Sequence, residues 1–222
     1  APMYFYRKGK GNYKSAPPDT LKAALAGQEK KRLQAEHVAQ MYLRTMAPDV
    51  LLTEKFGDTR MTESAAICQY LAARHSPGML GVALHEPAYG AYLNWLHMSD
   101  ATLTFPQTLV LRYTHFEPPE RLQPQVAADY ARWFLARLRA VDAALQSAEY
   151  LCAGRFTAAD VAVGYALLLA QHLGLSAQFP PAVAAYWQRL QARPAYQRAL
   201  QVQHQAALDQ GVPTTPSPDI RP

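Results

Sequence analysis

Cysteine is scarce in this sequence, and none precedes Cys68. The only other cysteine, Cys152, lies like Cys68 in an apolar stretch with helical spacing. This setting predicts two free buried thiols rather than a disulfide, and it fits a reducing compartment. No spacing of cysteine and histidine is typical of a metal site, so we expect no metal.

Long apolar runs are also missing. None approaches the roughly 20 residues that a membrane-spanning helix needs, and no apolar leader with a basic flank is present. We therefore expect a cytoplasmic protein without a membrane partner. Half of the 222 residues are hydrophobic and 18% are charged, which indicates a globular chain with one large or two small cores.

Lysine is absent after Lys55. Up to position 75 there are 12 Lys and Arg against 7 Asp and Glu, and beyond it there are 10 against 10, so the net charge of +5 lies in the first third. This excess is either a solvated face or the mark of a first domain that attracts anions. No dense basic run with interleaved aromatics occurs, so we expect no nucleic-acid partner.

The first third has the order of an α/β domain. Residues 3–7 are aromatic-rich and predict a strand, followed by a basic loop and a helix entered through Pro17 and Pro18. Residues 48–53 predict a turn and a strand, and residues 54–60 predict a hairpin. We assign residues 1–76 to this domain.

Only helices are expected after a linker at residues 77–87, which Pro and Gly residues bracket. Apolar periodicity predicts helices over 89–104, 125–146, 157–173, 182–190 and 194–206, within an all-α domain spanning 88–207. Pro106 is expected to bend or end the first of these helices. The helix over 157–173 is apolar nearly all round, which predicts a central position. The tail, 208–222, is proline-rich at 213–218 and is expected to be mobile.

Residues 62–71 read as a helix start with an acidic residue and a hydroxyl at its beginning. Free backbone N–H groups and a partial positive charge gather at such an end and hold a carboxylate well. The side chain of Glu63 could pair with a neighbouring ammonium, so the segment could recognise both charges of an amino acid. The alternative is an N-capped amphipathic helix without a ligand.

A second helix start carries a capping box. The hydroxyl of Thr157 can accept from the N–H of Asp160, and the carboxylate of Asp160 can accept from the N–H of Thr157. Removing either partner should cost about 0.5–2 kcal/mol. We assign this box a structural role and no catalysis.

These two motifs together carry a family resemblance. Glu-Ser-x-Ala-Ile-x-x-Tyr-Leu at 63–71 and Phe-Thr-x-Ala-Asp at 156–160 resemble the two hallmarks of the glutathione transferase superfamily, bacterial cytosolic type. The resemblance covers residues 50–205 well, including 92–96 and 184–194, and residues 1–50 poorly. It implies an α/β thioredoxin-like N-terminal domain followed by an all-α helical-bundle C-terminal domain. The family's Val-Pro-x-Leu segment is absent, because Val50 stands in its place and Pro48 is displaced.

The resemblance also implies a chemistry, in which a hydrogen-bond donor near the first strand stabilises the thiolate of glutathione. Absence of an early cysteine argues against a cysteine-type mechanism. Tyr6, Asn12, Tyr13 and Ser15 are the possible donors, and we favour Tyr6 and Ser15 as catalytic. Tyr6 could instead be a core aromatic, and Ser15 a helix cap.

By the same resemblance, Glu63 and Ser64 should bind the γ-glutamyl group, and the backbone of Val50 or Leu51 should pair with the cysteinyl part. Asp100 should reach the γ-glutamyl amine across a dimer interface; the alternative is a solvated helix residue. The candidates for the pocket of the apolar co-substrate are Trp95, Met98, Thr102, Phe105 and Tyr113. His97 could be a polar wall of that pocket or a lone surface histidine.

The implied function is that of a homodimeric detoxification enzyme that conjugates the glutathione thiolate to an electrophilic carbon of an apolar co-substrate. Glutathione is then a co-substrate, and a small electrophile is the other partner. Two alternatives stay open: a glutathione-dependent isomerase or dehalogenase, and a non-catalytic binding module with a transferase-like fold.

Overall fold

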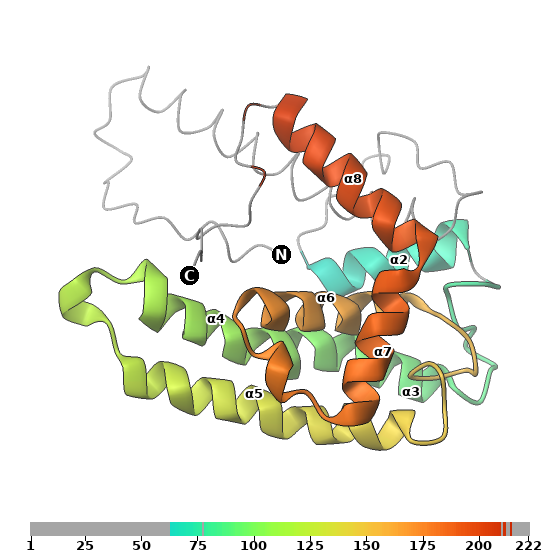
Figure 1. Ribbon diagram of the computed structural model, residues 1–222. Helices are drawn as coiled ribbons and strands as arrows, with labels where there is room; N and C mark the ends of the chain where they lie inside the picture. Colours follow the sequence, from blue (N-terminus) through green and yellow to red (C-terminus); the bar gives the residue numbers. More distant parts are fainter. Residues whose placement is uncertain (1–62, 77, 210, 212–213, 215–222) are drawn as a thin grey trace, which may run out of the picture.

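The computed structural model describes residues 63–76, 78–209, 211 and 214. Over these ranges the chain is built of helices and connecting turns, without a strand (Figure 1). The first described helix is α2, Ser64–His75, which begins where residues 62–71 predict a helix start. The strands and the hairpin predicted between residues 3 and 60 lie outside the described residues.

A long helical rod follows the linker, and it alternates between α-helical and π-helical segments along its length. It runs through α3, Tyr89–Met98, the π-helical segment η3, Ser99–Thr104, α4, Phe105–Leu111, and a second π-helical segment η4, Arg112–Phe116. The helix does not end at Pro106. The wide π-helical turn of η3 ends at Thr104, and α4 begins at Phe105, directly before this proline. In η3 the Phe105 N–H donates to the carbonyl of Asp100, five residues back.

Helix α5, Pro124–Leu145, runs antiparallel to this rod and packs along it (Figure 1). A short 3-10 turn, Pro119–Arg121, precedes it and accounts for the predicted break at Pro118 and Pro119. The buried face of α5 carries apolar residues at helical spacing, which confirms the amphipathic helix predicted over 125–146. These buried residues are Ala127, Phe134, Leu138, Val141 and Leu145.

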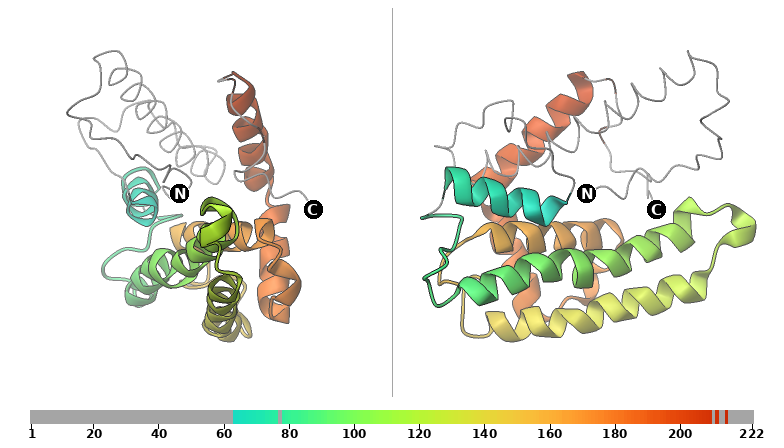
Figure 2. Two further views of the ribbon diagram at one scale, coloured as in Figure 1. Left: turned by 90° about the vertical axis from the view of Figure 1, so that its left-hand side faces the viewer. Right: turned by 180° about the vertical axis from the view of Figure 1, so that it is seen from behind.

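Helix α6, Ala158–His172, lies at the centre of the bundle, as its apolar composition predicts, and packs against α2, α3, η3 and α7. A Cβ on Gly164 would stand 3.1 Å from the Leu190 side chain, so glycine allows α6 and α7 to approach closely. After a 3-10 turn, Ser176–Gln178, the chain continues into α7, Pro181–Ala192, and α8, Pro194–Asp209. Figure 2 shows α8 projecting beyond the bundle.

Cys68 and Cys152 are both free and buried, which confirms the expectation for the two thiols. Within the described ranges, no helix combines the length and the hydropathy that crossing a membrane requires. Most of the tail predicted to be mobile lies outside the described residues.

Candidate functional site

Helix α2 starts without a side-chain cap. Its N-cap residue Glu63 has extended backbone angles (φ −87°, ψ 121°), and the Glu63 side chain makes no capping hydrogen bond to the first turn. The carbonyl of Glu63 accepts from the N–H of Ile67 at 2.9 Å, so the N–H groups of residues 64–66 precede the helical ladder. These groups and the helix dipole form an electropositive end that favours a carboxylate.

The hydroxyl of Ser64 lies at this open start and points to a carboxylate from another helix. Ser64 Oγ donates to Asp100 Oδ1 at 3.2 Å, and both residues are half-buried. Asp100 lies in η3, and α2 packs against η3. The structure thus brings together three predicted site residues, since Glu63 directly precedes Ser64. The two charges needed to hold an amino-acid zwitterion, a positive helix end and a carboxylate, stand side by side.

The carboxylate of Asp100 also influences the core side of α2. Burial, and after it the negative charge of Asp100, raises the pKa of the Cys68 thiol from 9.0 to about 12. Cys68 is therefore a neutral thiol at physiological pH and cannot serve as a nucleophile.

The five co-substrate candidates follow one another along α3, η3, α4 and η4 but differ in exposure. Trp95 is buried in the hydrophobic core, and Met98 packs against that core. Thr102 and Tyr113 are half-buried, and Phe105 is 47% exposed. The guanidinium of Arg112 lies 5.4 Å from the centre of the Tyr113 ring. Phe105 is thus the candidate most open to an apolar molecule, and Trp95 the least.

Two buried polar residues near η3 were not singled out from the sequence. The side-chain amide of Gln107 donates to the carbonyls of Leu103 at 2.9 Å and Ala166 at 3.0 Å, and so ties the rod to α6. The hydroxyl of Thr104 is buried without a hydrogen-bond partner among the described residues. Neither position has a local sequence signal, because the burial of both residues and the bond from Gln107 to Ala166 follow from how the helices pack.

The remaining predicted positions fall into two groups. Tyr6, Ser15, Val50 and Leu51 lie outside the described residues, as do the alternatives Asn12 and Tyr13. His97 is exposed on α3, as a surface histidine would be.

The capping box at the start of α6 is present as predicted. The hydroxyl of Thr157 accepts from the first turn of the helix, and the carboxylate of Asp160 accepts from the Thr157 N–H at 2.8 Å. The same carboxylate accepts from the N–H of Leu151 at 3.1 Å and from the hydroxyl of Tyr186 at 2.8 Å. Burial raises the pKa of Asp160, and the donated hydrogen bonds oppose this rise. The polar groups of the capping box therefore form their hydrogen bonds with other groups of the protein.

The start of α2 thus faces Asp100, on a bundle whose central helix α6 begins with a capping box. The family model for "Glutathione S-transferase, C-terminal domain" matches residues 109–194. Glutathione S-transferase GstA from Escherichia coli O157:H7 is 28% identical over 172 residues, which cover 77% of this chain and 81% of that protein. Residues 109–194 therefore form a glutathione S-transferase C-terminal domain, and the chain over most of its length is similar to glutathione transferases.

Solved structures show the same fold at lower identity. The theta class glutathione S-transferase from Xanthomonas axonopodis pv. citri, with glutathione bound, is 23% identical with a TM-score of 0.61, covering 76% of this chain and 93% of that one. Ure2p5 from Phanerochaete chrysosporium is 20% identical with a TM-score of 0.62, covering 76% and 81%.

Proposed function

We propose that this protein binds glutathione at the start of α2 and transfers its thiolate to an electrophilic carbon of an apolar co-substrate. The observation that carries the proposal is the hydrogen bond at this helix start, where the Ser64 hydroxyl donates to the Asp100 carboxylate at 3.2 Å. The match to the glutathione S-transferase C-terminal domain and the glutathione bound to the Xanthomonas neighbour support it.

The γ-glutamyl end of glutathione carries an α-carboxylate and an α-ammonium. The α-carboxylate would accept hydrogen bonds from the backbone N–H groups at the start of α2 and from the Ser64 hydroxyl. The ammonium would donate hydrogen bonds to the carboxylates of Glu63 and Asp100. The hydroxyl of Ser64 donates a hydrogen bond to Asp100. An arriving ammonium would neutralise Asp100 and leave the hydroxyl proton for the carboxylate of the ligand.

The placement of Asp100 refines the expected assembly of the site. Resemblance to the family implied that Asp100 acts across a dimer interface. The hydrogen bond to Ser64 lies within one chain, so we propose that Asp100 serves the site of its own subunit. A homodimer stays part of the proposal, but its partner is then not needed to complete the ammonium site.

The chemical step is the attack of the thiolate on the electrophilic carbon. A free thiol has a pKa of about 8.5, so a donor aimed at the sulfur is needed to raise the share of thiolate at neutral pH. Tyr6 or Ser15 would supply it, and Val50 or Leu51 would hold the cysteinyl backbone. The sulfur–carbon bond forms as the leaving group departs with its electron pair, and the thiol proton passes to solvent.

The co-substrate would lie against the rod formed by α3, η3 and α4. Met98, Thr102, Phe105 and Tyr113 would contact it, with Trp95 supporting them from the core. The neighbour Ure2p5 was cocrystallized with 1-(S-glutathionyl)-2,4-dinitrobenzene, a conjugate of glutathione with an electron-poor aromatic ring. This makes an activated aromatic halide a suitable first probe.

Calorimetric titration with glutathione tests the proposal, followed by turnover of 1-chloro-2,4-dinitrobenzene. We expect binding and release of chloride with formation of the conjugate. A folded protein that does not bind glutathione would overturn the proposal. Binding with turnover only of maleyl-type or other halogenated substrates would favour an isomerase or dehalogenase. Binding of glutathione without turnover of any substrate would favour a non-catalytic binding module.

A further inference from the structure

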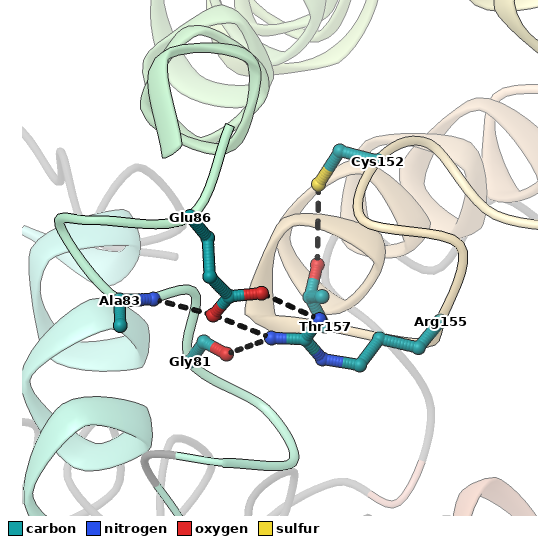
Figure 3. A network of polar contacts seen from close by, with 6 residues as sticks. All are labelled: Gly81, Ala83, Glu86, Cys152, Arg155 and Thr157. Carbon is teal, nitrogen blue, oxygen red and sulfur yellow. Dashed lines mark hydrogen bonds and ion pairs between the residues drawn. The ribbon is translucent and has the colours of Figure 1, made fainter. Parts of the chain in front are cut away.

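The segment between α2 and α3 is fastened by an arginine from the loop before α6. Arg155 Nη1 donates to Glu86 Oε2 at 2.8 Å, and Arg155 Nη2 donates to Glu86 Oε1 at 2.9 Å and to the Gly81 carbonyl at 3.0 Å (Figure 3). Glu86 Oε1 also accepts from the Ala83 N–H at 2.7 Å. We name Gly81, Ala83, Glu86 and Arg155 the linker clamp.

Backbone hydrogen bonds extend the linker clamp to the end of α2. The carbonyl of Ser76, which follows α2, accepts from the N–H groups of Leu80 at 3.0 Å and Gly81 at 3.1 Å. The carbonyl of Leu80 in turn accepts from the N–H of Ala158, the first residue of α6, at 2.9 Å. A continuous set of hydrogen bonds therefore joins the end of α2 to the start of α6.

The charges in the linker clamp reinforce its geometry. A planar guanidinium that donates twice to one carboxylate fixes both position and orientation. The hydrogen bonds from Arg155, then that from the Ala83 N–H, lower the pKa of Glu86 from 4.5 to about 2, and the charge of His85 acts weakly in the same direction. Glu86 is thus ionised at physiological pH and forms an ion pair with Arg155.

Helix α2 is short enough to move as a rigid body. Its 12 residues span about 18 Å, so a displacement at its end is carried to its start. At that start the Ser64–Asp100 hydrogen bond is already 3.2 Å long, and a shift of about 0.5 Å would take it beyond hydrogen-bonding distance. The position of the α2 start therefore depends on how firmly its other end is held.

We propose that Arg155 is a positioning residue for the glutathione site. Through the linker clamp it holds the end of α2 on α6, so that the open start of α2 stays against Asp100. The inference rests on the proposed function. Arg155 lies 55 residues beyond Asp100 in sequence and would act on the ligand only through α2.

Arg155→Met tests the proposal, because it keeps an apolar stem and removes the guanidinium. Arg132→Met on α5 is the matched control, since Arg132 forms an exposed ion pair with Asp129. We expect Arg155→Met to raise the Kd and the KM for glutathione about twofold to thirtyfold, with kcat at saturating glutathione kept. Arg155→Lys, which keeps the positive charge but lacks the planar guanidinium that donates twice to one carboxylate, should give an intermediate KM.

A purely structural arginine would behave differently. Loss of folded protein lowers the apparent kcat and leaves the KM unchanged, so that result would overturn the proposal, as would a KM equal to that of Arg132→Met. Glu86→Gln should raise the KM in the same direction, and the double variant Glu86→Gln/Arg155→Met should add little to Arg155→Met alone. Additive effects of the two changes would contradict the linker clamp.

Amide hydrogen exchange without ligand separates this inference from the proposed function. We expect residues 64–72 to exchange faster in Arg155→Met than in Arg132→Met. If the wild type does not bind glutathione, the proposed function fails, and faster exchange still supports the hold of Arg155 on α2. Equal exchange in the two variants would overturn it whether or not glutathione binds.

Discussion

The N-cap side chain of α6 forms hydrogen bonds with the first turn of its helix, whereas the N-cap side chain of α2 does not. At α6, the Thr157 hydroxyl accepts from the first turn, the Asp160 carboxylate accepts from the Thr157 N–H, and the carbonyl of Leu80 accepts from the Ala158 N–H. At α2, Glu63 makes no capping hydrogen bond, and the Ser64 hydroxyl turns to Asp100 on another helix. The two starts lie in one bundle and belong to helices that pack against each other.

The difference separates stability from binding. A helix start whose donors are all taken by the protein has nothing left for a ligand, but it holds the surrounding loop in place. A start whose donors are left open contributes less to folding and keeps its electropositive end for an anion. Four predictions test this division, beginning with the largest effect.

Asp160→Ala should destabilise the protein most. It removes the buried acceptor of the Leu151 N–H, the Thr157 N–H and the Tyr186 hydroxyl, so we expect a loss of about 3–5 kcal/mol in the free energy of unfolding. Chemical denaturation measures it. Asp129→Ala, at a carboxylate that is 51% exposed, is the control and should change stability by less than about 0.5 kcal/mol. Equal losses in the two variants would break the comparison.

Thr157→Ala should reduce stability without affecting glutathione. Loss of the capping hydroxyl, which is fully buried, is expected to cost about 1–2 kcal/mol, while the Kd for glutathione stays the same. Thr157→Ser, which keeps the hydroxyl, should restore most of the stability. Denaturation and calorimetry on the same samples give both quantities, and a large change in Kd would contradict a purely structural box.

Ser64→Ala should weaken glutathione binding and leave the stability nearly unchanged. We expect the Kd for glutathione to rise about tenfold, as for one lost hydrogen bond to a charged group, with stability changed by less than about 0.5 kcal/mol. Calorimetric titration measures the Kd, and Ser147→Ala at an exposed position is the control. An unchanged Kd would show that the open start does not hold the ligand.

The smallest effect is that of pH on the linker clamp. Because the pKa of Glu86 is lowered to about 2 in the folded protein, the clamp stabilises above the ordinary value of 4.5 and weakens as pH falls from there through about 2. The difference in Tm between wild type and Glu86→Gln should therefore be constant from about pH 5 to 8 and shrink near pH 3. A difference that changes above pH 5 would contradict the assignment to Glu86.

The sequence predicted what depends on neighbouring residues. The Thr157–Asp160 box spans four residues, and the buried face of α5 repeats at helical spacing, so both could be recognised without a structure. The helix start at Ser64 was found in the same way. The α/β half was predicted from strand and turn patterns and from a family resemblance, and it lies outside the described residues.

Contacts between distant residues could not be predicted from local patterns. Glu86 and Arg155 are 69 residues apart, and nothing in the sequence paired them. Ser64 and Asp100 are 36 apart, and only the family resemblance placed them at one site, across a dimer interface. Each residue alone looks like an ordinary surface side chain, and only helix packing brings the pairs together. The π-helical turn before Pro106 was also missed, because a few residues of altered period do not disturb the apolar pattern.

Both cysteines sit beside the two helix starts, Cys68 on α2 and Cys152 at 3.7 Å from the Thr157 hydroxyl. Burial raises the pKa of each thiol, so the folded protein presents almost no thiolate of its own. A protein that handled alkylating compounds would thereby escape self-modification. Labelling by a thiol reagent would proceed only when a helix start opens, which makes each cysteine a built-in reporter for its own end of the bundle.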